Sequence, residues 1–476
     1  MNHQETIRAV RSAIAAKRQD LAVDQIRRLV GSGAAMGAGG AELLQLSLAL
    51  ADEDIALEIA KAMHRETQDD PKHAFILAER YSRAGRSDIA LQIIVDLERT
   101  LPPNPALDYF KAVYSGHLGR LEDAASHARR AIQRKPEFGD AWAVLATTGR
   151  HSNDDRTVLE RLMRGSRPHA LPGAAYALGA VYHAKGEPDL AWEAWSKANQ
   201  GETQKQPYNA NQDIAAMADI TTAFSRLADK KPAATSGSVN GMPQPIFVVG
   251  PPRSGTSLTE QIIGLAQGTY AMGETLFSRL ATWRLGNLTQ ADLERVGGFQ
   301  TGQIDWRLIG TVYRTLSQAR SDGAAFVTDK GAVLNLFVGA LAYALPEAKF
   351  IWVRRDKRDT ALSAWRTYLT GGARWRHSLQ NAEAYLSAHE KMMADWYEMF
   401  PDRIYRLNYE DLARSPQTEV NALMGFLGLP APDLSISDLS SATVSTASFA
   451  QIRSKITTRS VGGWKAYERW FNPVFD

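Results

Sequence analysis

A glycine loop between an apolar run and a helical pattern is the first segment of this sequence suited to chemistry. Residues 245–257 read PIFVVGPPRSGTS. The apolar run Ile246–Val249 predicts a buried strand, and the LTEQIIGLA that follows the loop has helical periodicity. A strand, a glycine loop and a helix N-terminus form an anion site, because the first backbone N–H groups of a helix have no intrahelical acceptor. The residues expected to hold an oxyanion here are Arg253, Ser254, Gly255, Thr256 and Ser257.

The loop lacks the lysine on which nucleoside triphosphate sites depend. Gly250 and Gly255 have the spacing of a P-loop, but Thr256 occupies the position of that lysine, which reaches the β- and γ-phosphates in such enzymes. Arg253 is the cation that the loop offers instead. A P-loop kinase or nucleoside triphosphatase therefore stays an alternative, which the missing lysine disfavours.

A second basic segment follows another predicted strand. Residues 349–353, KFIWV, are apolar throughout and are followed by RRDKRDTALSAW, which places Arg355 at the strand end and Ser363 eight residues later. Arginine offers phosphate a planar and permanently charged donor fork. Taken alone, the cluster of Arg354, Arg355 and Arg358 is more typical of a solvated basic turn.

Together, the PRSGTS string and the Arg355/Ser363 pair resemble the sulfotransferases. The likeness is to the tyrosylprotein type and to bacterial sulfotransferases with tetratricopeptide repeats, in which PRSGTT is usual, so Ser257 keeps the hydroxyl. The resemblance implies an α/β, P-loop-like domain with a central parallel sheet. It also implies 3'-phosphoadenylyl sulfate (PAPS) as co-substrate, its 5'-phosphosulfate on the loop and its 3'-phosphate on Arg355 and Ser363.

Tyr409 and a basic C-terminal segment extend the resemblance. Tyr409 lies in LNYEDL, which is similar to the family's YED segment near the nucleotide; its alternative role is that of a surface aromatic residue. Residues 439–467 contain no Asp or Glu, which suits a polyanionic ligand. They resemble the family's segment that closes over the cofactor, although Gly463 replaces the usual basic residue before Trp464. The residues expected to contact the cofactor here are Lys455, Arg459 and Ser460.

Sulfuryl transfer requires a base for the acceptor hydroxyl, a cation for the leaving oxygen and donors for the transferring group. The resemblance assigns these roles to Glu274 in MGET, Lys330 in VTDKGA and Ser448 in TASFAQI. Ala332 stands where cytosolic sulfotransferases place a histidine, which argues against that type. The chemistry requires no metal, and the ten histidines show no HExxH or similar cluster, so no metal is expected.

These assignments leave alternatives open. Glu274 would otherwise start a helix at Leu276, and Lys330 would otherwise pair with Asp329 or another neighbour. A non-catalytic repeat scaffold with a decayed transferase domain is a further alternative for the whole chain. The intact set of candidate residues argues against it.

The first half of the chain repeats with a period of 34 residues. Gly85 and Ala90 recur at Gly119 and Ala124, and the same steps backward reach Ala56 and Ala22. A later copy has Gly186 and Ala191. A degenerate copy near Asn153 lies between this copy and the one at Gly119 and Ala124. A small residue at a fixed position lets paired helices approach closely, and the period resembles tetratricopeptide repeats, which stack into a solenoid. A non-repetitive helical bundle is the alternative.

The chain therefore divides into a repeat array at residues 1–200, a connecting helix and linker at 201–242, and a sulfotransferase domain at 243–476. The connecting helix is expected at 211–228, before a stretch rich in Pro, Gly, Ser and Thr. The strands expected in the parallel sheet are Ile246–Val249, Ala325–Thr328, Lys349–Val353 and Ile404–Leu407.

Length and composition limit the number of domains, the kinds of site and the partners that can be expected. A chain of 476 residues is too long for one core, and a formal net charge of +3 gives no reason to expect a nucleic-acid partner. With no cysteine, disulfides and thiolate sites are excluded. No apolar run suggests a signal peptide or a membrane span, so a cytoplasmic protein is expected. The partner expected is an acceptor substrate, a protein tyrosine by family analogy, with a peptide in the repeat groove; a glycan, a lipid or a small phenol stays open.

Overall fold

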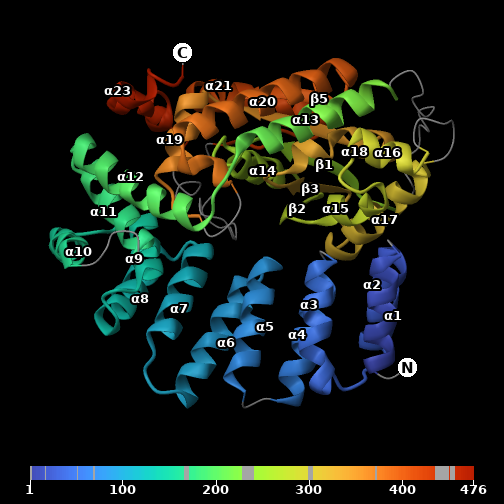
Figure 1. Cartoon of the computed structure of the whole chain (residues 1–476), viewed down its shortest axis with the longest axis horizontal. Helices are drawn as coiled ribbons and strands as arrows, with labels where there is room; N and C mark the ends of the chain where they lie inside the picture. The colour runs from blue at the N-terminus through green and yellow to red at the C-terminus, as the bar shows by residue number, and fades with distance from the viewer. Residues whose placement is uncertain are drawn as a thin grey trace.

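The structure, a computed structural model, has two parts that face each other (Figure 1). It describes residues 3–16, 18–50, 52–67, 70–165, 171–227, 241–297, 304–369, 373–434, 450 and 456–475. The N-terminal helices stand side by side in a curved row, and the α/β part lies across its open side (Figure 1).

The N-terminal part consists of helices joined in pairs by short turns. Their bounds are α1 His3–Ala15, α2 Gln19–Gly31, α3 Gly40–Ala49, α4 Glu53–Glu66, α5 Pro71–Arg83, α6 Ser87–Thr100, α7 Pro105–His117, α8 Leu121–Arg134, α9 Gly139–Thr147, α10 Asn153–Gly165, α11 Pro172–Ala184 and α12 Pro188–Lys205. The last of these continues to Lys205, beyond residue 200, where the repeat array was expected to end.

The positions marked by the 34-residue spacing have the packing that it predicts. The alanines at this spacing are fully buried in the second helix of their pairs: Ala22, Ala56, Ala90, Ala124 and Ala191. Gly85, Gly119 and Gly186 adopt left-handed φ angles of 79°, 80° and 73° in the turns. The assignment to the tetratricopeptide family stays a prediction.

The connecting helix is α13 (Ala210–Ser225), slightly earlier than the expected 211–228. It packs on α20 (Leu379–Met399), where the rings of Phe224 and Trp396 lie edge to face with centroids 5.6 Å apart. Residues 228–240, which hold most of the expected linker, lie outside the described residues.

The α/β part is built on a five-stranded parallel sheet with the strand order β2-β3-β1-β4-β5. The strands are β1 Gln244–Val249, β2 Thr269–Glu274, β3 Phe326–Lys330, β4 Lys349–Arg354 and β5 Ile404–Asn408. All four expected strands are confirmed within one or two residues. β2 was not predicted, because its sequence TYAMGE has neither a continuous apolar run nor strict alternation.

Helices cover both faces of the sheet, as expected. On one face, Ile246, Val248 and Ile351 pack with α14 and α22, whereas Phe247 and Phe350 point to the other face, their ring centroids 5.2 Å apart. The helices of this part are α14 Thr256–Gly264, α15 Phe277–Ala281, α16 Gln290–Arg295, α17 Trp306–Arg320, α18 Val338–Ala344, α19 Lys357–Trp365, α20, α21 Tyr409–Arg414, α22 Pro416–Leu427 and α23 Glu468–Phe471.

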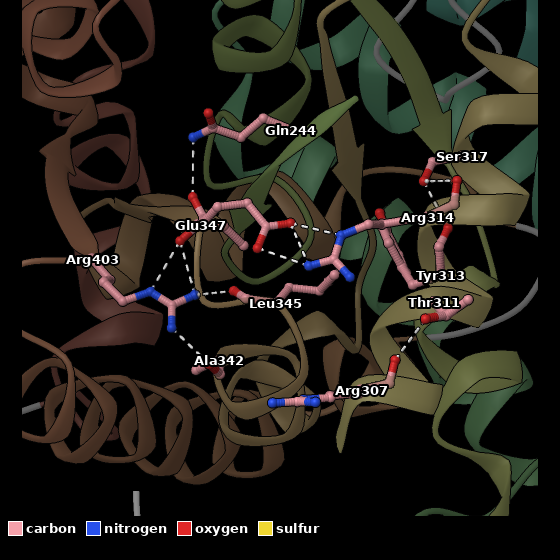
Figure 2. A network of polar contacts seen from close by, with 11 residues as sticks. Gln244, Arg307, Thr311, Tyr313, Arg314, Ser317, Ala342, Leu345, Glu347 and Arg403 are labelled. Atoms are coloured by element: carbon pink, nitrogen blue, oxygen red, sulfur yellow. Dashed lines mark hydrogen bonds and ion pairs between the residues drawn. The ribbon is translucent and has the colours of Figure 1, made fainter. Parts of the chain in front are cut away.

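A polar network fixes the amino ends of the central strands (Figure 2). The Glu347 carboxylate accepts two hydrogen bonds of 2.9 Å from Arg314, and its carbonyl oxygen accepts one of 3.0 Å from the Gln244 side chain. Arg403, just before β5, donates to the carbonyl oxygens of Ala342, Leu345 and Ala348. Buried carbonyls are thereby satisfied at one edge, and the strands are aligned for the opposite, carboxyl edge.

Within the part of the chain that the structure describes, no helix combines the length and the apolar character that crossing a bilayer requires.

The close approach of α11 and α12 gives a test of the helical packing. A Cβ atom at Gly179 would lie 2.2 Å from Trp195 Nε1, so Gly179→Ala should lower the free energy of unfolding by about 1–3 kcal/mol. Urea denaturation followed by tryptophan fluorescence measures this loss. The matched control is Gly425→Ala in α22, where nothing lies within 4 Å of the new methyl group; it should leave stability unchanged or raise it by roughly 0.5–1 kcal/mol. Equal stabilities of the two variants would contradict the packing.

Candidate active site

The candidate residues gather at the carboxyl edge of the sheet, where ligands bind in open α/β folds. Each of the five strands delivers one of them: Arg253 in the loop after β1, Glu274 at the end of β2, Lys330 at the end of β3, Arg355 after β4 and Tyr409 after β5.

The β1–α14 loop is tightly folded around its two glycines. A Cβ atom at Gly250 would lie 2.6 Å from Ser254 Oγ, and one at Gly255, whose φ is +113°, would lie 2.7 Å from the Tyr409 ring. Arg253 also has a left-handed φ, of 76°, which is uncommon for a residue with a side chain and typical of functional sites. The loop is therefore held in one conformation, with Thr256 starting the helix.

Arg355 is fixed on three sides. It donates to the carbonyl oxygen of Arg253 at 2.9 Å and to that of Ser460 at 2.6 Å, and its guanidinium lies 4.5 Å from the centre of the Tyr409 ring. It is half-buried, so it is not part of a solvated turn. Its neighbour Arg354 instead forms an ion pair with Glu390.

Ser363 belongs to the same cluster. Its hydroxyl oxygen accepts a hydrogen bond of 3.1 Å from Arg253 Nε, which joins the loop after β1 to α19. Burial and the nearby charges of Arg366 and Arg355 lower the pKa of Arg253. Since a guanidinium keeps its proton, the lowered pKa means that a buried positive charge lies beside two other cations.

The C-terminal segment is tied to the same cluster through Asp359. This buried carboxylate accepts hydrogen bonds from the backbone N–H groups of Gly462 (2.6 Å) and Trp464 (3.0 Å). The tether places Ser460 beside Arg355. Arg459 is exposed in the adjacent turn, and Lys465 is exposed as well.

Glu274 and Lys330 form an ion pair across β2 and β3. They are register partners in the sheet, and Lys330 Nζ donates to Glu274 Oε1 at 3.0 Å. The Glu274 side chain is 60% exposed, whereas that of Lys330 is 4% exposed. Glu274 therefore ends a strand rather than starting a helix, and its carboxylate remains accessible.

A second carboxylate, Glu260 of α14, lies beneath Lys330. Its Oε2 is 3.8 Å from Lys330 Nζ, and its Oε1 accepts hydrogen bonds of 3.0 Å from Thr328 Oγ1 and from the Gly273 backbone. Burial raises the pKa of Glu260, against the opposing attraction of Lys330. Burial lowers the pKa of Lys330, but Glu260 and Glu274 outweigh it and leave that pKa raised. The lysine therefore keeps its charge in a buried position.

Asp329 points away from Lys330 into the core. Its Oδ2 accepts hydrogen bonds from Thr275 Oγ1 (2.7 Å) and Tyr313 OH (2.9 Å), and burial raises its pKa to about 6. The expected alternative of a Lys330–Asp329 pair is therefore wrong, whereas pairing of the lysine with other neighbours is observed. The Thr275 contact fixes the chain directly after Glu274.

Two buried polar atoms of the cluster have no partner in the protein. Ser254 Oγ and Arg355 Nε are both inaccessible to solvent and make no hydrogen bond. Buried polar groups are normally satisfied, so these atoms fit a site that receives an oxyanion. Ser448 and Lys455 lie outside the described residues.

Sequence reasoning missed Glu260, Asp359 and Arg366. Glu260 is the one charged side chain in the helical run LTEQIIGLA, and a lone charge on a helix that follows an anion loop was an available signal. Asp359 follows Arg355 by four residues and was overlooked because the surrounding segment is basic. Arg366 has no local signal, since its surroundings come from a distant part of the chain.

Part of the chain is similar to a known protein family. Residues 245–433 match the Sulfotransferase family. An uncharacterized protein of Aquifex aeolicus (strain VF5) is 28% identical over 416 residues, which are 81% of this chain and 53% of the relative. The chain thus spans about half the length of the curated relative that it matches.

The solved structures that the chain resembles are less similar in sequence than the Aquifex aeolicus relative. The sulfotransferase domain of the Synechococcus PCC 7002 olefin synthase is 19% identical with a TM-score of 0.32, covering 49% of this chain and 96% of that one. The sulfotransferase from Alicyclobacillus acidocaldarius is 16% identical with a TM-score of 0.28, covering 48% and 96%. MamA is 18% identical with a TM-score of 0.29, covering 35% and 97%. Arg253, Glu274, Lys330, Arg355, Ser363 and Tyr409 all fall within the residues that match the Sulfotransferase family.

Proposed function

We propose that the chain is a PAPS-dependent sulfotransferase, which moves a sulfuryl group from 3'-phosphoadenylyl sulfate to the hydroxyl group of an acceptor. The observation that carries the proposal is the joining of Arg253, Arg355 and Ser363 at a strand edge, beside buried donors that have no protein partner. The division into a tetratricopeptide array (1–200), a connecting segment (201–242) and the transferase domain (243–476) belongs to the same proposal.

The donor nucleotide is held at two anionic ends. The β1–α14 loop, with the N-terminus of α14, Ser254 and Arg253, takes the 5'-phosphosulfate. Arg355 and Ser363 take the 3'-phosphate. Tyr409, which stacks on Arg355, lies between these two positions and borders the nucleoside.

The C-terminal segment closes over the bound nucleotide. Ser460 already accepts a hydrogen bond from Arg355, and Arg459 is exposed on the adjacent turn. Lys455, with Ser448 as a donor to the transferring group, belongs to the same proposed closure.

Glu274 is the proposed general base. Its exposed carboxylate takes the proton of the acceptor hydroxyl as that oxygen bonds to sulfur. The bond from sulfur to the bridging oxygen breaks, and adenosine 3',5'-bisphosphate leaves. The buried ammonium of Lys330, held by Glu260 on its other side, neutralises the charge that develops on the leaving oxygen.

A phenolic acceptor, such as a protein tyrosine, fits the surroundings of the ion pair. Leu276 and Val333 follow Glu274 and Lys330 by two and three residues, and both are exposed large apolar side chains. An acceptor with an apolar ring would cover them. The curved row of helices opposite the transferase part is the proposed surface for the rest of a peptide (Figure 1).

Nucleotide binding gives the first test. Adenosine 3',5'-bisphosphate should stabilise the fold, and 5'-AMP should bind more weakly, because a charge-assisted bidentate contact contributes roughly 1.5–3 kcal/mol. Thermal shifts at equal nucleotide concentration measure the difference. Equal shifts would remove the assignment of Arg355 and Ser363 to the 3'-phosphate.

A pair of adjacent arginines provides a matched comparison. Arg355→Ala should raise the Kd for adenosine 3',5'-bisphosphate by about 10- to 100-fold, whereas Arg354→Ala should leave it near the wild-type value, because Arg354 is paired with Glu390. Calorimetric titration measures both affinities, and circular dichroism checks that both variants fold. The reverse order of effects would transfer the role to Arg354.

Removal of the base should affect turnover and not donor binding. Glu274→Gln keeps the shape of the side chain but cannot take a proton, so kcat should fall by about two orders of magnitude or more. The kcat of the variant should fall less with acidic phenols than with alkyl alcohols as acceptors, because phenol hydroxyls ionise more easily. Steady-state kinetics with both acceptor classes measures this, with Glu294→Gln as control, an exposed glutamate that pairs with Arg226. Near-normal turnover of Glu274→Gln would exclude the carboxylate as base.

A further inference from the structure

Arg366 is a third cation at the proposed phosphate site. It follows α19 directly and lies one helical turn after Ser363, on the same side of the helix. Its charge is close enough to lower the pKa of Arg253, and the charge of Arg355 contributes to lowering its own pKa, after burial. Among the described residues, no carboxylate lies within salt-bridge distance of Arg355 or Arg366. Some other group must therefore hold Arg366 in place.

That group is His183, which belongs to α11 in the helical part of the chain. Its Nε2 lies 2.9 Å from Arg366 Nη1, and its Nδ1 lies 2.8 Å from Tyr467 OH. Burial and the neighbouring Arg366 lower the pKa of His183 to about 4, so the ring is neutral at physiological pH. Since arginine can only donate, Nε2 is the acceptor, and the ring proton sits on Nδ1, directed at the tyrosine oxygen.

The backbone beside Arg366 is fastened to the same helical pair. The Trp192 ring of α12 stacks on Trp365 with centroids 5.1 Å apart, and Asn199 of α12 donates to the Trp365 carbonyl oxygen at 3.0 Å. Tyr467 lies in a fully buried position a few residues after the segment that Asp359 tethers. The helical part thus fixes both the backbone and the side chain at the end of α19.

We propose that His183 is a positioning residue for nucleotide recognition, which aims Arg366 at the 3'-phosphate next to Ser363. This inference rests on the proposed function. The helical part then contributes one wall of the donor site in addition to any role in acceptor binding. It also makes donor affinity dependent on the contact between the two parts of the chain.

The test compares two nucleotides on one variant. His183→Ala should raise the Kd for adenosine 3',5'-bisphosphate roughly tenfold, the scale of one charge-assisted hydrogen bond, and leave the Kd for 5'-AMP within about twofold. A merely structural loss would weaken both nucleotides equally. His183→Gln, whose amide oxygen can accept from Arg366, should recover part of the affinity.

Two further variants and a control distinguish a positioning role from a general loss of structure. In an Arg366→Ala background, His183→Ala should have no additional effect, because the side chain that it positions is gone. Tyr467→Phe, which removes only the hydroxyl, should cause a smaller loss of affinity for adenosine 3',5'-bisphosphate. This variant replaces His183→Ala in the test if His183→Ala does not fold. His151→Ala, in the turn between α9 and α10, is the control and should bind both nucleotides normally.

The outcomes separate the inference from the proposal on which it rests. If the wild type prefers adenosine 3',5'-bisphosphate but His183→Ala keeps that preference unchanged, the positioning role is wrong and the donor site stands. Equal loss of both nucleotides also overturns the positioning role. If the wild type does not distinguish the two nucleotides, the proposed function fails and the inference fails with it.

Discussion

The repulsion between three closely placed guanidinium groups is the constraint around which the carboxyl edge of the sheet is organised. Burial first and neighbouring positive charge second lower the pKa values of Arg253 and Arg366, and a cluster of this kind would disperse if the side chains were free to move. Neutral acceptors oppose this dispersal: backbone carbonyl oxygens, the Ser363 hydroxyl and the His183 ring. Since these acceptors cancel no charge, the cluster keeps a positive field for an incoming dianion.

The ion pair of Lys330 and Glu274 is arranged differently, because its charges are compensated. Lys330 is buried and would be costly there alone, so two carboxylates surround it, one buried at Glu260 and one exposed at Glu274. The buried carboxylate holds the lysine, which leaves the exposed one available to exchange a proton with an acceptor. The compensated ion pair at the ends of β2 and β3 is thus separate from the cluster of guanidinium groups in the loop after β1 and around α19. That separation suits a reaction in which charge moves from an acceptor hydroxyl to a leaving nucleotide.

Local sequence signals predicted the parts of this edge that depend on local geometry. The PRSGTS loop, four of the strands and the buried alanines of the helical pairs all follow from short apolar runs, glycines and fixed spacings. Gly255 is a good example, because its left-handed conformation and its contact with Tyr409 both exclude a side chain. β2 escaped prediction because it lies at the sheet edge and is only partly buried, so its sequence carries no strand period. Arg366 was not predicted as a site residue, because its partner His183 contacts it only when the two parts of the chain pack together.

Transfer of a labelled sulfuryl group would show directly whether the protein is a sulfotransferase. The protein would be incubated with PAPS labelled in the sulfuryl group and a lysate of the source cells, and in parallel with ATP labelled in the γ-phosphate and Mg²⁺. A sulfotransferase will give a labelled hydroxyl ester, with release of one adenosine 3',5'-bisphosphate for each sulfuryl group transferred, and no transfer from ATP. Transfer of phosphate from ATP, with PAPS left intact, would contradict this function and restore the P-loop kinase that the missing lysine disfavours.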